Sequence, residues 1–399
     1  ALYGNASALS ESPKKEGLIY IGTDDGLLQV TEDGGKTWRK IEKVLDIPEN
    51  SYVRRVLASR HDVNTVYAIF DNHQNGDFKP YAAKSVDAGR TWTMITGNLP
   101  ERGSLYALAE DHVNPNLLFV GTEFGFFFTP SLNADGGAKW IQLKGGLPTI
   151  TVRDIAVHRR ENDLVLATFG RGFYVLDDYS PLRGVNAETL AQESNLFPVK
   201  DALMYVRSSL NFSGSQGASF FTASNPPYGA TISYYLKDSI RTKRQQRQQA
   251  EREAARKNEP IKYPTRQELL AEAEEEPPAL LFTISDAEGK IVRRLSAPAT
   301  FGLQRVTWDF RYAPPVLQAA PQLPPGMEGL DLAALGGGFG QGPQGELAMP
   351  GKYTVTMAKR VGGVITPLPG SQMFNVGAEG TEKMTSQDRN ILAEFQRKV

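Results

Sequence analysis

Hydrophobic residues in the first half of the chain fall into short runs that recur at a regular spacing. Each of four segments offers about four such runs, rich in Val, Ile, Leu, Tyr and Phe and separated by turns of Gly, Asp, Asn and Pro. The equivalent positions Tyr20, Tyr67, Phe119 and Val165 lie roughly 46 to 52 residues apart, a spacing typical of propeller blades. The pattern predicts an all-β fold in which residues 1–195 form a partial β-propeller of about four blades.

Two of these segments carry nearly the same eight residues between their third and fourth runs, TEDGGKTW (the first box) and SVDAGRTW (the second box). In such a turn an Asp side chain can accept hydrogen bonds from backbone amides, a Gly can take a positive φ, and the Trp can pack between blades. A catalytic residue is needed once per site, so a motif that recurs with the repeat is typical of a folding device. The structural residues predicted in the boxes are Thr31, Asp33, Gly35, Thr37, Trp38, Ser85, Asp87, Gly89, Thr91 and Trp92.

Three of the four histidines share one place in the repeat. His61, His112 and His158 all fall at the turn between the first and second runs of a segment. A lone catalytic base would not appear three times at one repeat position, so these side chains are predicted to be turn or inter-blade residues. His73 is the exception, because it lies in a long loop between the second and third runs.

The regular spacing stops after LDDYSPLRG, and a boundary near residue 195 separates the blades from a second β region. There, runs such as ATISYYL, ALLFTISDAEGKIVRRL and GKYTVTMAKRVGGVITPL alternate apolar and polar residues, with Gly289 in a hairpin turn. This pattern predicts a β-sandwich of immunoglobulin or fibronectin type over residues 196–236 and 277–377.

Residues 237–276 interrupt that sandwich with a charged insertion, basic in its first half and acidic in its second. Two interpretations are open. The insertion forms two helices that lie antiparallel with opposite charges facing, or it is a solvated and partly mobile segment.

Residues 378–399 at the end of the chain predict an amphipathic helix. A capping-box pattern runs from Thr385 to Asp388. The apolar stripe that follows consists of Ile391, Leu392, Phe395 and Val399.

Composition narrows the chemistry that the 399 residues can perform. The chain has no cysteine, which excludes disulfides, thiolate metal sites and a cysteine nucleophile. Its formal net charge of -1 gives no global electrostatic reason to bind nucleic acid or an anionic membrane. No apolar run approaches the roughly 18 to 20 residues that span a bilayer, and the first residues, ALYGNASALS, lack the features of a signal peptide. We therefore expect no nucleic-acid partner, no membrane span, no cofactor and no metal.

Ligands of a propeller are expected on the face that bears the loops between second and third strands and the linkers between blades. The acidic residues of these loops, which are the candidate catalytic carboxylates, are Asp24, Asp25, Asp71, Asp77 and Glu123. The other candidate ligand contacts are His73, Phe124 and Arg171 in the loops, and Arg54, Arg55 and Arg153 at the start of the innermost strands. A glycosidase needs two carboxylates about 5 to 10 Å apart across a cleft, and acidic turn residues are common on any propeller. A sialidase would also need an arginine cluster and a tyrosine with a glutamate partner, and no spacing in the chain singles these out.

The second box is similar almost letter for letter to the Asp-box, or bacterial neuraminidase repeat, S-x-D-x-G-x-T-W. In that family the box lies on the face of the propeller away from the ligand. The order of GTDDG, GTEFG, ATFGRGFYVLDDY, NPPYGATISYYL, ISDAEGKIVRRL and PGKYTV resembles the C-terminal part of large bacterial propeller proteins. Those proteins are described as sortilin-type or Asp-box-repeat proteins and are often called glycosyl hydrolases. The cysteine-rich module that follows the propeller in sortilins has no counterpart here.

The resemblance implies an exported bacterial protein, in the periplasm, at the cell surface or secreted, with further blades from upstream sequence or from another chain. It also implies protein or glycan partners. The function that follows is a non-catalytic binding or assembly module. The alternative is a glycoside hydrolase, similar to a sialidase or a xyloglucanase, that acts on a polysaccharide in a cleft shared with further blades.

Overall fold

The computed structural model describes residues 4–130, 132, 137–205, 223–314, 345–379 and 385–398. The chain forms two compact units, Ala1–Asn186 and Ala187–Val399, and this division lies upstream of the predicted boundary near residue 195. Among the residues described, no helix is long and apolar enough to cross a membrane.

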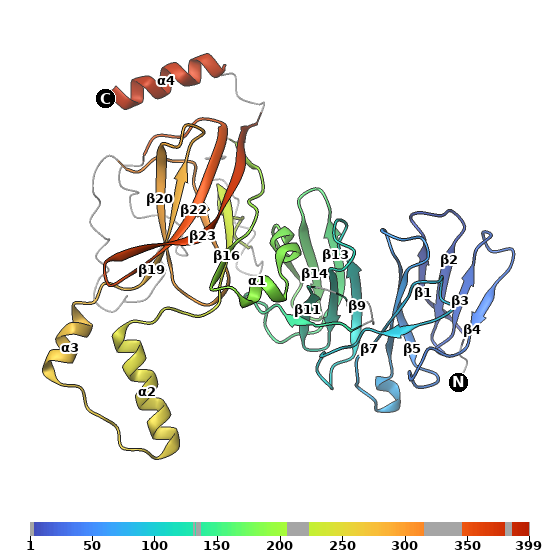
Figure 1. The fold of residues 1–399 in the computed structure, drawn as a ribbon. Coiled ribbons are helices and arrows are strands. Elements are labelled where there is room, and N and C mark those ends of the chain that lie inside the picture. Colours follow the sequence, from blue (N-terminus) through green and yellow to red (C-terminus); the bar gives the residue numbers. More distant parts are fainter. Residues whose placement is uncertain are drawn as a thin grey trace, which may run out of the picture. The chain divides into compact units, whose positions relative to one another are not determined.

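The first unit consists of four antiparallel sheets that follow one another along the chain (Figure 1). Blade 1 contains β1 (Ala6–Glu11), β2 (Ile19–Thr23), β3 (Leu28–Thr31) and β4 (Arg39–Ile41). Blade 2 contains β5 (Tyr52–Ala58), β6 (Val66–Asp71), β7 (Tyr81–Ser85) and β8 (Thr93–Met94). Blade 3 contains β9 (Leu105–Glu110), β10 (Leu118–Thr122), β11 (Gly125–Thr129) and β12 (Ile141–Gln142), and blade 4 contains β13 (Val152–His158), β14 (Asp163–Thr168) and β15 (Phe173–Leu176). The all-β, propeller-like fold predicted from the repeat is confirmed.

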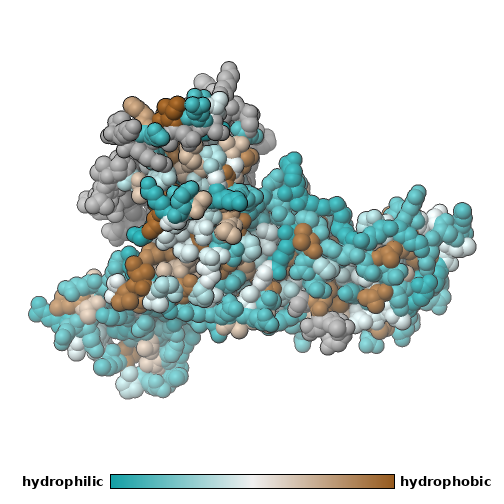
Figure 2. Space-filling view, turned by 45° about the horizontal axis from the view of Figure 1, so that its top comes forward, coloured by the Kyte–Doolittle hydropathy of each residue, from teal (hydrophilic) through white to brown (hydrophobic). Residues whose placement is uncertain are grey.

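Successive blades pack face to face. β1 and β2 contact β5, β5 and β6 contact β9, and β9 and β10 contact β13. Between the first two blades, Tyr20 and Val30 of blade 1 pack with Val56 and Phe70 of blade 2, and all four are buried. In blade 4, Phe173 of β15 is 75% exposed. Figure 2 shows that the surface of the blades in that view is mainly hydrophilic, with separate hydrophobic patches.

The two boxes form the same hydrogen-bonded turn. Asp87 Oδ1 accepts hydrogen bonds from the backbone N–H groups of Arg90 (2.9 Å) and Thr91 (2.8 Å), and its Oδ2 accepts one from the Thr91 hydroxyl (2.6 Å). In the first box, Asp33 accepts from the backbone N–H (2.9 Å) and the hydroxyl (2.6 Å) of Thr37. Each aspartate therefore closes the turn in which it lies.

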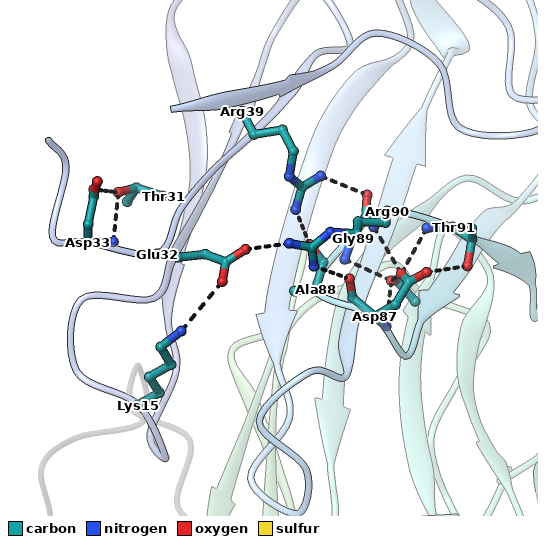
Figure 3. Close-up of polar contacts among 11 residues, drawn as sticks. Lys15, Thr31, Glu32, Asp33, Arg39, Asp87, Ala88, Gly89, Arg90 and Thr91 are labelled. Atoms are coloured by element: carbon teal, nitrogen blue, oxygen red, sulfur yellow. Dashed lines mark hydrogen bonds and ion pairs between the residues drawn. The ribbon is translucent and has the colours of Figure 1, made fainter. Parts of the chain in front are cut away.

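Polar side chains also link the two boxes across the interface between blades 1 and 2 (Figure 3). Arg39 of β4 donates to the carbonyl oxygens of Ala88 (2.5 Å) and Gly89 (3.4 Å). Arg90 donates to Glu32 at 2.9 Å. The second box is thus held against blade 1.

The second unit contains two sheets that share one hydrophobic core. One sheet has the order β16 (Ser194–Leu196), β18 (Ala230–Leu236) and β21 (Gly302–Trp308). The other has the order β17 (Ala202–Met204), β23 (Val364–Ala378), β22 (Gly351–Val361), β19 (Ala279–Ser285) and β20 (Ile291–Pro298). Trp308 of the first sheet is buried in one cluster with Phe282 and Val355 of the second. That this two-sheet unit is of immunoglobulin or fibronectin type stays a prediction.

The charged insertion is helical. It contains α2 (Lys243–Lys257) and α3 (Arg266–Ala273), and each helix begins with a capping box. Arg247 of α2 pairs with Glu272 of α3, with Nε and Oε1 2.7 Å apart. Of the two interpretations of this segment, the structure therefore supports the pair of charged helices.

The remaining elements are η1 (His73–Asn75), η2 (Ser180–Gly184), α1 (Ala187–Ala191) and the C-terminal α4 (Ser386–Lys398). At the start of α4 the Thr385 hydroxyl accepts a hydrogen bond from the Asp388 N–H (3.1 Å), as a capping box requires. Ile391, Leu392 and Phe395 of its apolar stripe are exposed. Val399 lies outside the described residues.

Candidate ligand-binding face

The innermost strand of each blade carries a β-bulge near its start. The pairing of each inner strand with its neighbour shifts by one residue at Ser7 in β1, Arg54 in β5, Tyr106 in β9 and Arg153 in β13. A bulge leaves one residue out of the hydrogen-bonded strand pairing and changes the direction of its side chain. Three long side chains at the same place in the repeat are therefore turned out of the regular pairing in blades 2, 3 and 4.

These side chains stack on one another as an arginine–aromatic ladder, formed by Tyr52, Arg54, Tyr106, Arg153 and Phe169. The Arg54 guanidinium lies 4.7 Å from the ring centre of Tyr52 and 5.0 Å from that of Tyr106. The Arg153 guanidinium lies 4.1 Å from the Tyr106 ring and 5.2 Å from the Phe169 ring. Cations at these distances are attracted by the ring quadrupole, so the contacts help to position both guanidinium groups across three blades.

One end of the ladder is anchored by a buried carboxylate. Asp71, at the end of β6, is buried and pairs with Arg54 at 2.6 Å. His73 Nδ1 lies 2.8 Å from both carboxylate oxygens of Asp71. Burial raises the pKa of Asp71, but the hydrogen bonds from Arg54 and His73 outweigh it and hold the pKa below its usual range. Asp71 is therefore ionised at neutral pH and offsets the charge of Arg54.

Arg153, at the other end, has no carboxylate partner among the described residues. Its contacts are the two aromatic rings, and its side chain is exposed. Phe169, which flanks it, is 67% exposed. A guanidinium positioned between two rings, with N–H groups that pair with none of the described residues, can donate two parallel hydrogen bonds to a carboxylate.

Two more polar groups belong to this region, the hydroxyl of the ladder residue Tyr106 and the carboxylate of Glu123. Burial, together with the charges of Asp71 and Glu123, raises the pKa of Tyr106, although Arg153 works in the opposite direction. Tyr106 therefore remains a neutral phenol that can donate a hydrogen bond. Glu123 Oε2 is buried and accepts no hydrogen bond from the described residues. Such an orphaned oxygen requires an explanation, for which a water or a ligand group is the ordinary one.

Three of the predicted acidic residues already accept hydrogen bonds, Asp24 from the start of the chain and Asp25 and Asp77 from nearby residues. Asp24 accepts hydrogen bonds from the backbone N–H groups of residues 4 and 5 and from the Asn5 side chain, and Asp25 accepts one from the Thr23 hydroxyl. Asp77 accepts from the Tyr81 hydroxyl at 2.6 Å. These contacts order the loops between second and third strands and leave the three carboxylates little capacity for a substrate.

The other predicted contacts are spread along the same face. Phe124 lies in the β10–β11 turn and is partly exposed, and Arg171 lies exposed in the β14–β15 turn. Arg55 forms an ion pair with Asp154 of β13 at 2.7 Å, which links blade 2 to blade 4. Of the predicted residues, the structure thus brings Arg54, Asp71 and His73 into contact and places Arg153 on the same ladder.

Sequence reasoning missed Tyr106 and Tyr52. A signal for Tyr106 was available, because it occupies the repeat position that Arg54 and Arg153 occupy in the neighbouring blades. Within the part of the chain that the structure describes, no group of three or more His, Asp or Glu side chains could hold a metal ion.

Comparisons with known proteins give distant similarity only. No family model and no curated protein matches the sequence. Among solved structures, the chain is similar to the extracellular domain of the putative hybrid two-component system BT3049 from B. thetaiotaomicron (TM-score 0.34, 9% identity, covering 93% of this chain and 38% of that one). It is also similar to YCF48 bound to D1 peptide (TM-score 0.29, 14% identity, 45% and 54% covered) and to an ancestral GH74 enzyme (TM-score 0.34, 15% identity, 59% and 32% covered). The chain therefore spans between about a third and a little over half of the length of these structures.

Proposed function

We propose that this chain is a non-catalytic binding module of an exported bacterial propeller protein, and that the arginine–aromatic ladder is its contact surface for an acidic protein or glycan segment. The observation that supports this most directly is the stacking of Arg153 between Tyr106 and Phe169, where no carboxylate of the described residues pairs with it. Flat rings offer apolar contact area, and a pre-oriented guanidinium pairs with a carboxylate at little cost in side-chain entropy.

The extracytoplasmic location, the Asp-box assignment of the two boxes and the immunoglobulin-like type of the second unit belong to the same proposal. They rest on the motifs that resemble sortilin-type propeller proteins. In this assignment the boxes lie on the face away from the ladder, so substitutions in them change stability and leave ligand binding unchanged.

The first test combines a glycan array with a pull-down, using the whole chain and its Arg153→Gln variant. Loss of the guanidinium removes a charge-assisted pair, so we expect affinity for the captured ligand to fall by at least about tenfold. Arg160→Gln is the matched control, because Arg160 is an exposed arginine paired with Glu161. Equal binding by all three proteins would contradict the proposal.

The same samples separate binding from hydrolysis. We expect a captured glycan to be recovered intact after long incubation with the protein. Release of reducing ends that Glu123→Gln abolishes would instead support the glycoside hydrolase alternative, because Glu123 carries the unpaired buried carboxylate oxygen beside the ladder.

A further inference from the structure

A second group of cations lines a partly open cavity at the other end of the inner strands. A cavity of about 170 Å³ opens where β5, β9 and β13 finish. It is lined by Arg55, Leu57, Arg60, Leu108, Ala109, Glu110, His112, Ile155, Val157 and Arg159. None of the five ladder residues lines this cavity, called here the axial pocket. The pocket is therefore distinct from the ladder, although Arg55 in its lining follows Arg54 directly in the sequence.

Besides Arg55, three cationic or potentially cationic residues line the axial pocket, and they occupy the same position in three repeats. Leu57 pairs with Tyr67, Ala109 with Phe119 and Ala156 with Val165, and the second member of each pair is an equivalent position of the repeat. Three residues after the first member of each pair come Arg60, His112 and Arg159. Blades 2, 3 and 4 thus each contribute one cationic or potentially cationic side chain from this repeat position to the pocket.

The charges of this pocket are not balanced by its carboxylates. The guanidinium groups of Arg60 and Arg159 form no ion pair or hydrogen bond with the described residues, and Arg55 is already paired with Asp154. Glu110 contributes one negative charge, but its oxygens accept from the Ser59 hydroxyl (2.7 Å) and from the Arg60 backbone N–H (2.8 Å). Two guanidinium groups therefore share one engaged carboxylate.

His112 is held in the pocket wall by a buried network. Its Nδ1 lies 3.1 Å from the Tyr179 hydroxyl, which in turn donates to Asp111 at 2.6 Å. Arg183 donates to both oxygens of Asp111 at 2.8 Å. These contacts orient the imidazole ring of His112, and the Arg183 guanidinium offsets the negative charge of Asp111.

The electrostatics of the pocket favour an added anion. Burial lowers the pKa of Arg60, and the charge of Arg159 lowers it further. Burial also lowers the pKa of His112, and together with the charges of Arg183, Arg159 and Arg60 it outweighs the opposite effect of Asp111. The apolar walls formed by Leu108, Ile155 and Val157 lower the local dielectric constant, which strengthens any ion pair formed there.

We propose that the axial pocket binds a phosphate group, with Arg60 and Arg159 as its cationic ligands. His112 gives a further hydrogen bond once its ring is protonated beside the bound anion, because the N–H of the neutral ring is directed to the Tyr179 hydroxyl. A tetrahedral dianion offers oxygens in several directions and can meet donors that approach from three blades, whereas a planar carboxylate is best matched by one guanidinium. The volume of about 170 Å³ exceeds the ≈30 Å³ share of a water molecule severalfold and accommodates the ion with part of an attached group. This site does not depend on the proposed function of the ladder.

The test is thermal unfolding and calorimetric titration of the whole chain with inorganic phosphate, with sodium chloride and sodium acetate at matched ionic strength as references. We expect phosphate to raise the Tm in a saturable manner and acetate to raise it less. Arg60→Gln and Arg159→Gln should each weaken phosphate binding by at least about tenfold, because each removes a charge-assisted contact. Arg160→Gln, one residue along the chain and on the surface, should bind phosphate as the parent does. Glycerol phosphate as a second probe distinguishes a site for phosphate esters from a site for the free ion.

The pKa of His112 provides a second measurement. It should change if Arg60 and Arg159 hold an anion beside the ring, and it should not change if these arginines only stabilise the fold. Binding of an anion between Arg60, Arg159 and His112 should raise the pKa of this imidazole, as followed by NMR with His112→Gln used for assignment. Arg153→Gln should leave both phosphate binding and this shift intact, which keeps the axial pocket distinguishable from the ladder. Equal Tm shifts in phosphate, acetate and chloride, or equal binding by Arg159→Gln and Arg160→Gln, would overturn the proposal.

Discussion

The two boxes have almost the same sequence and the same hydrogen bonds, but their tryptophans differ in burial. In both, the indole N–H donates to the carbonyl oxygen of the glycine three residues earlier, Gly35 for Trp38 (3.1 Å) and Gly89 for Trp92 (3.2 Å). Trp92 is 9% exposed and lies in the core that blades 1 and 2 share, whereas Trp38 is 42% exposed. The turn is therefore built from contacts within eight residues. The burial of the Trp92 indole depends in addition on its packing against blade 1.

The difference in burial between Trp38 and Trp92 separates two contributions to stability, the hydrogen bonds within the turn and the apolar packing between blades. Hydrogen bonds to Asp33 and Asp87 close each turn whether or not a blade covers it. Apolar packing is added for Trp92, because its ring lies in the core shared with the preceding blade, blade 1. Matched substitutions in the two boxes can therefore measure turn closure and blade packing independently.

The largest expected effect is the loss of the buried indole. Trp92→Ala should lower the free energy of unfolding of the first unit by about 3 to 5 kcal/mol, because it leaves a cavity between blades 1 and 2. Trp38→Ala should cost less than about 1 kcal/mol, since much of that ring already faces solvent. Denaturant unfolding of the two variants checks this, and similar losses for both would contradict the packing difference.

A smaller difference in the loss of stability is expected between alanine variants of Gly89 and Gly35, the glycines whose carbonyl oxygens accept the indole hydrogen bonds. Gly89 has φ +79°, and an added Cβ would lie 3.0 Å from Ile41 Cδ1 of blade 1. Gly89→Ala should therefore cost about 2 kcal/mol or more, from backbone strain and from the contact. Gly35 has φ +93°, but the nearest atom to an added Cβ is on Trp38, 3.8 Å away.

Gly35→Ala should accordingly cost only the backbone strain, about 1 to 2 kcal/mol. Equilibrium unfolding of both glycine variants gives the comparison. A larger loss for Gly35→Ala than for Gly89→Ala would show that blade 1 does not constrain the second box.

The expected role of Asp87 illustrates what sequence can predict. Every partner of its carboxylate lies within four residues, so the spacing of the motif alone specifies the turn. The repeat spacing and the alternation of apolar residues likewise predicted the blades and the second β unit. These features depend on local geometry and on the period of the pattern, which a sequence displays directly.

The ladder could be predicted only in part, because it depends on contacts between residues far apart in the chain. Arg54 and Arg153 were recognised as starting the inner strands, but the stacking on Tyr106 requires a bulge in each strand and the approach of three blades. Asp71 was one of several acidic loop residues until its burial and its ion pair with Arg54 distinguished it. The helices of the charged insertion could not be predicted with certainty either, because the separation of basic and acidic residues was compatible with a pair of helices or with a mobile segment.

Removal of the turn carboxylate should affect both boxes in the same direction. Asp87→Ala leaves the N–H groups of Arg90 and Thr91 without their acceptor, and because the turn is exposed to water the cost should be about 1 kcal/mol. Asp33→Ala should lower the Tm similarly, in contrast to the unequal tryptophan pair. Unfolding and ligand binding should be measured together, because an Asp87→Ala protein that keeps its stability and loses binding would place the second box in a functional site.

The smallest effect expected is a reversible weakening of the same turn by acid. Burial raises the pKa of Asp87, but hydrogen bonds from Thr91, Ser85 and the backbone of Arg90 outweigh it and lower the pKa to about 2, against about 3.9 in an unfolded chain. A carboxyl group whose pKa is depressed by folding stabilises the fold above its unfolded pKa, and this contribution is lost as the pH falls through the folded pKa. The stability difference between the parent and Asp87→Asn should therefore be constant above about pH 5 and should shrink between about pH 4 and pH 2. Solvent screening of this exposed group keeps the change small, so unfolding curves of both proteins at each pH must be compared directly, with Asp33→Asn as the second pair. A difference that persists unchanged to pH 2 would mean that the carboxylate charge does not hold the turn.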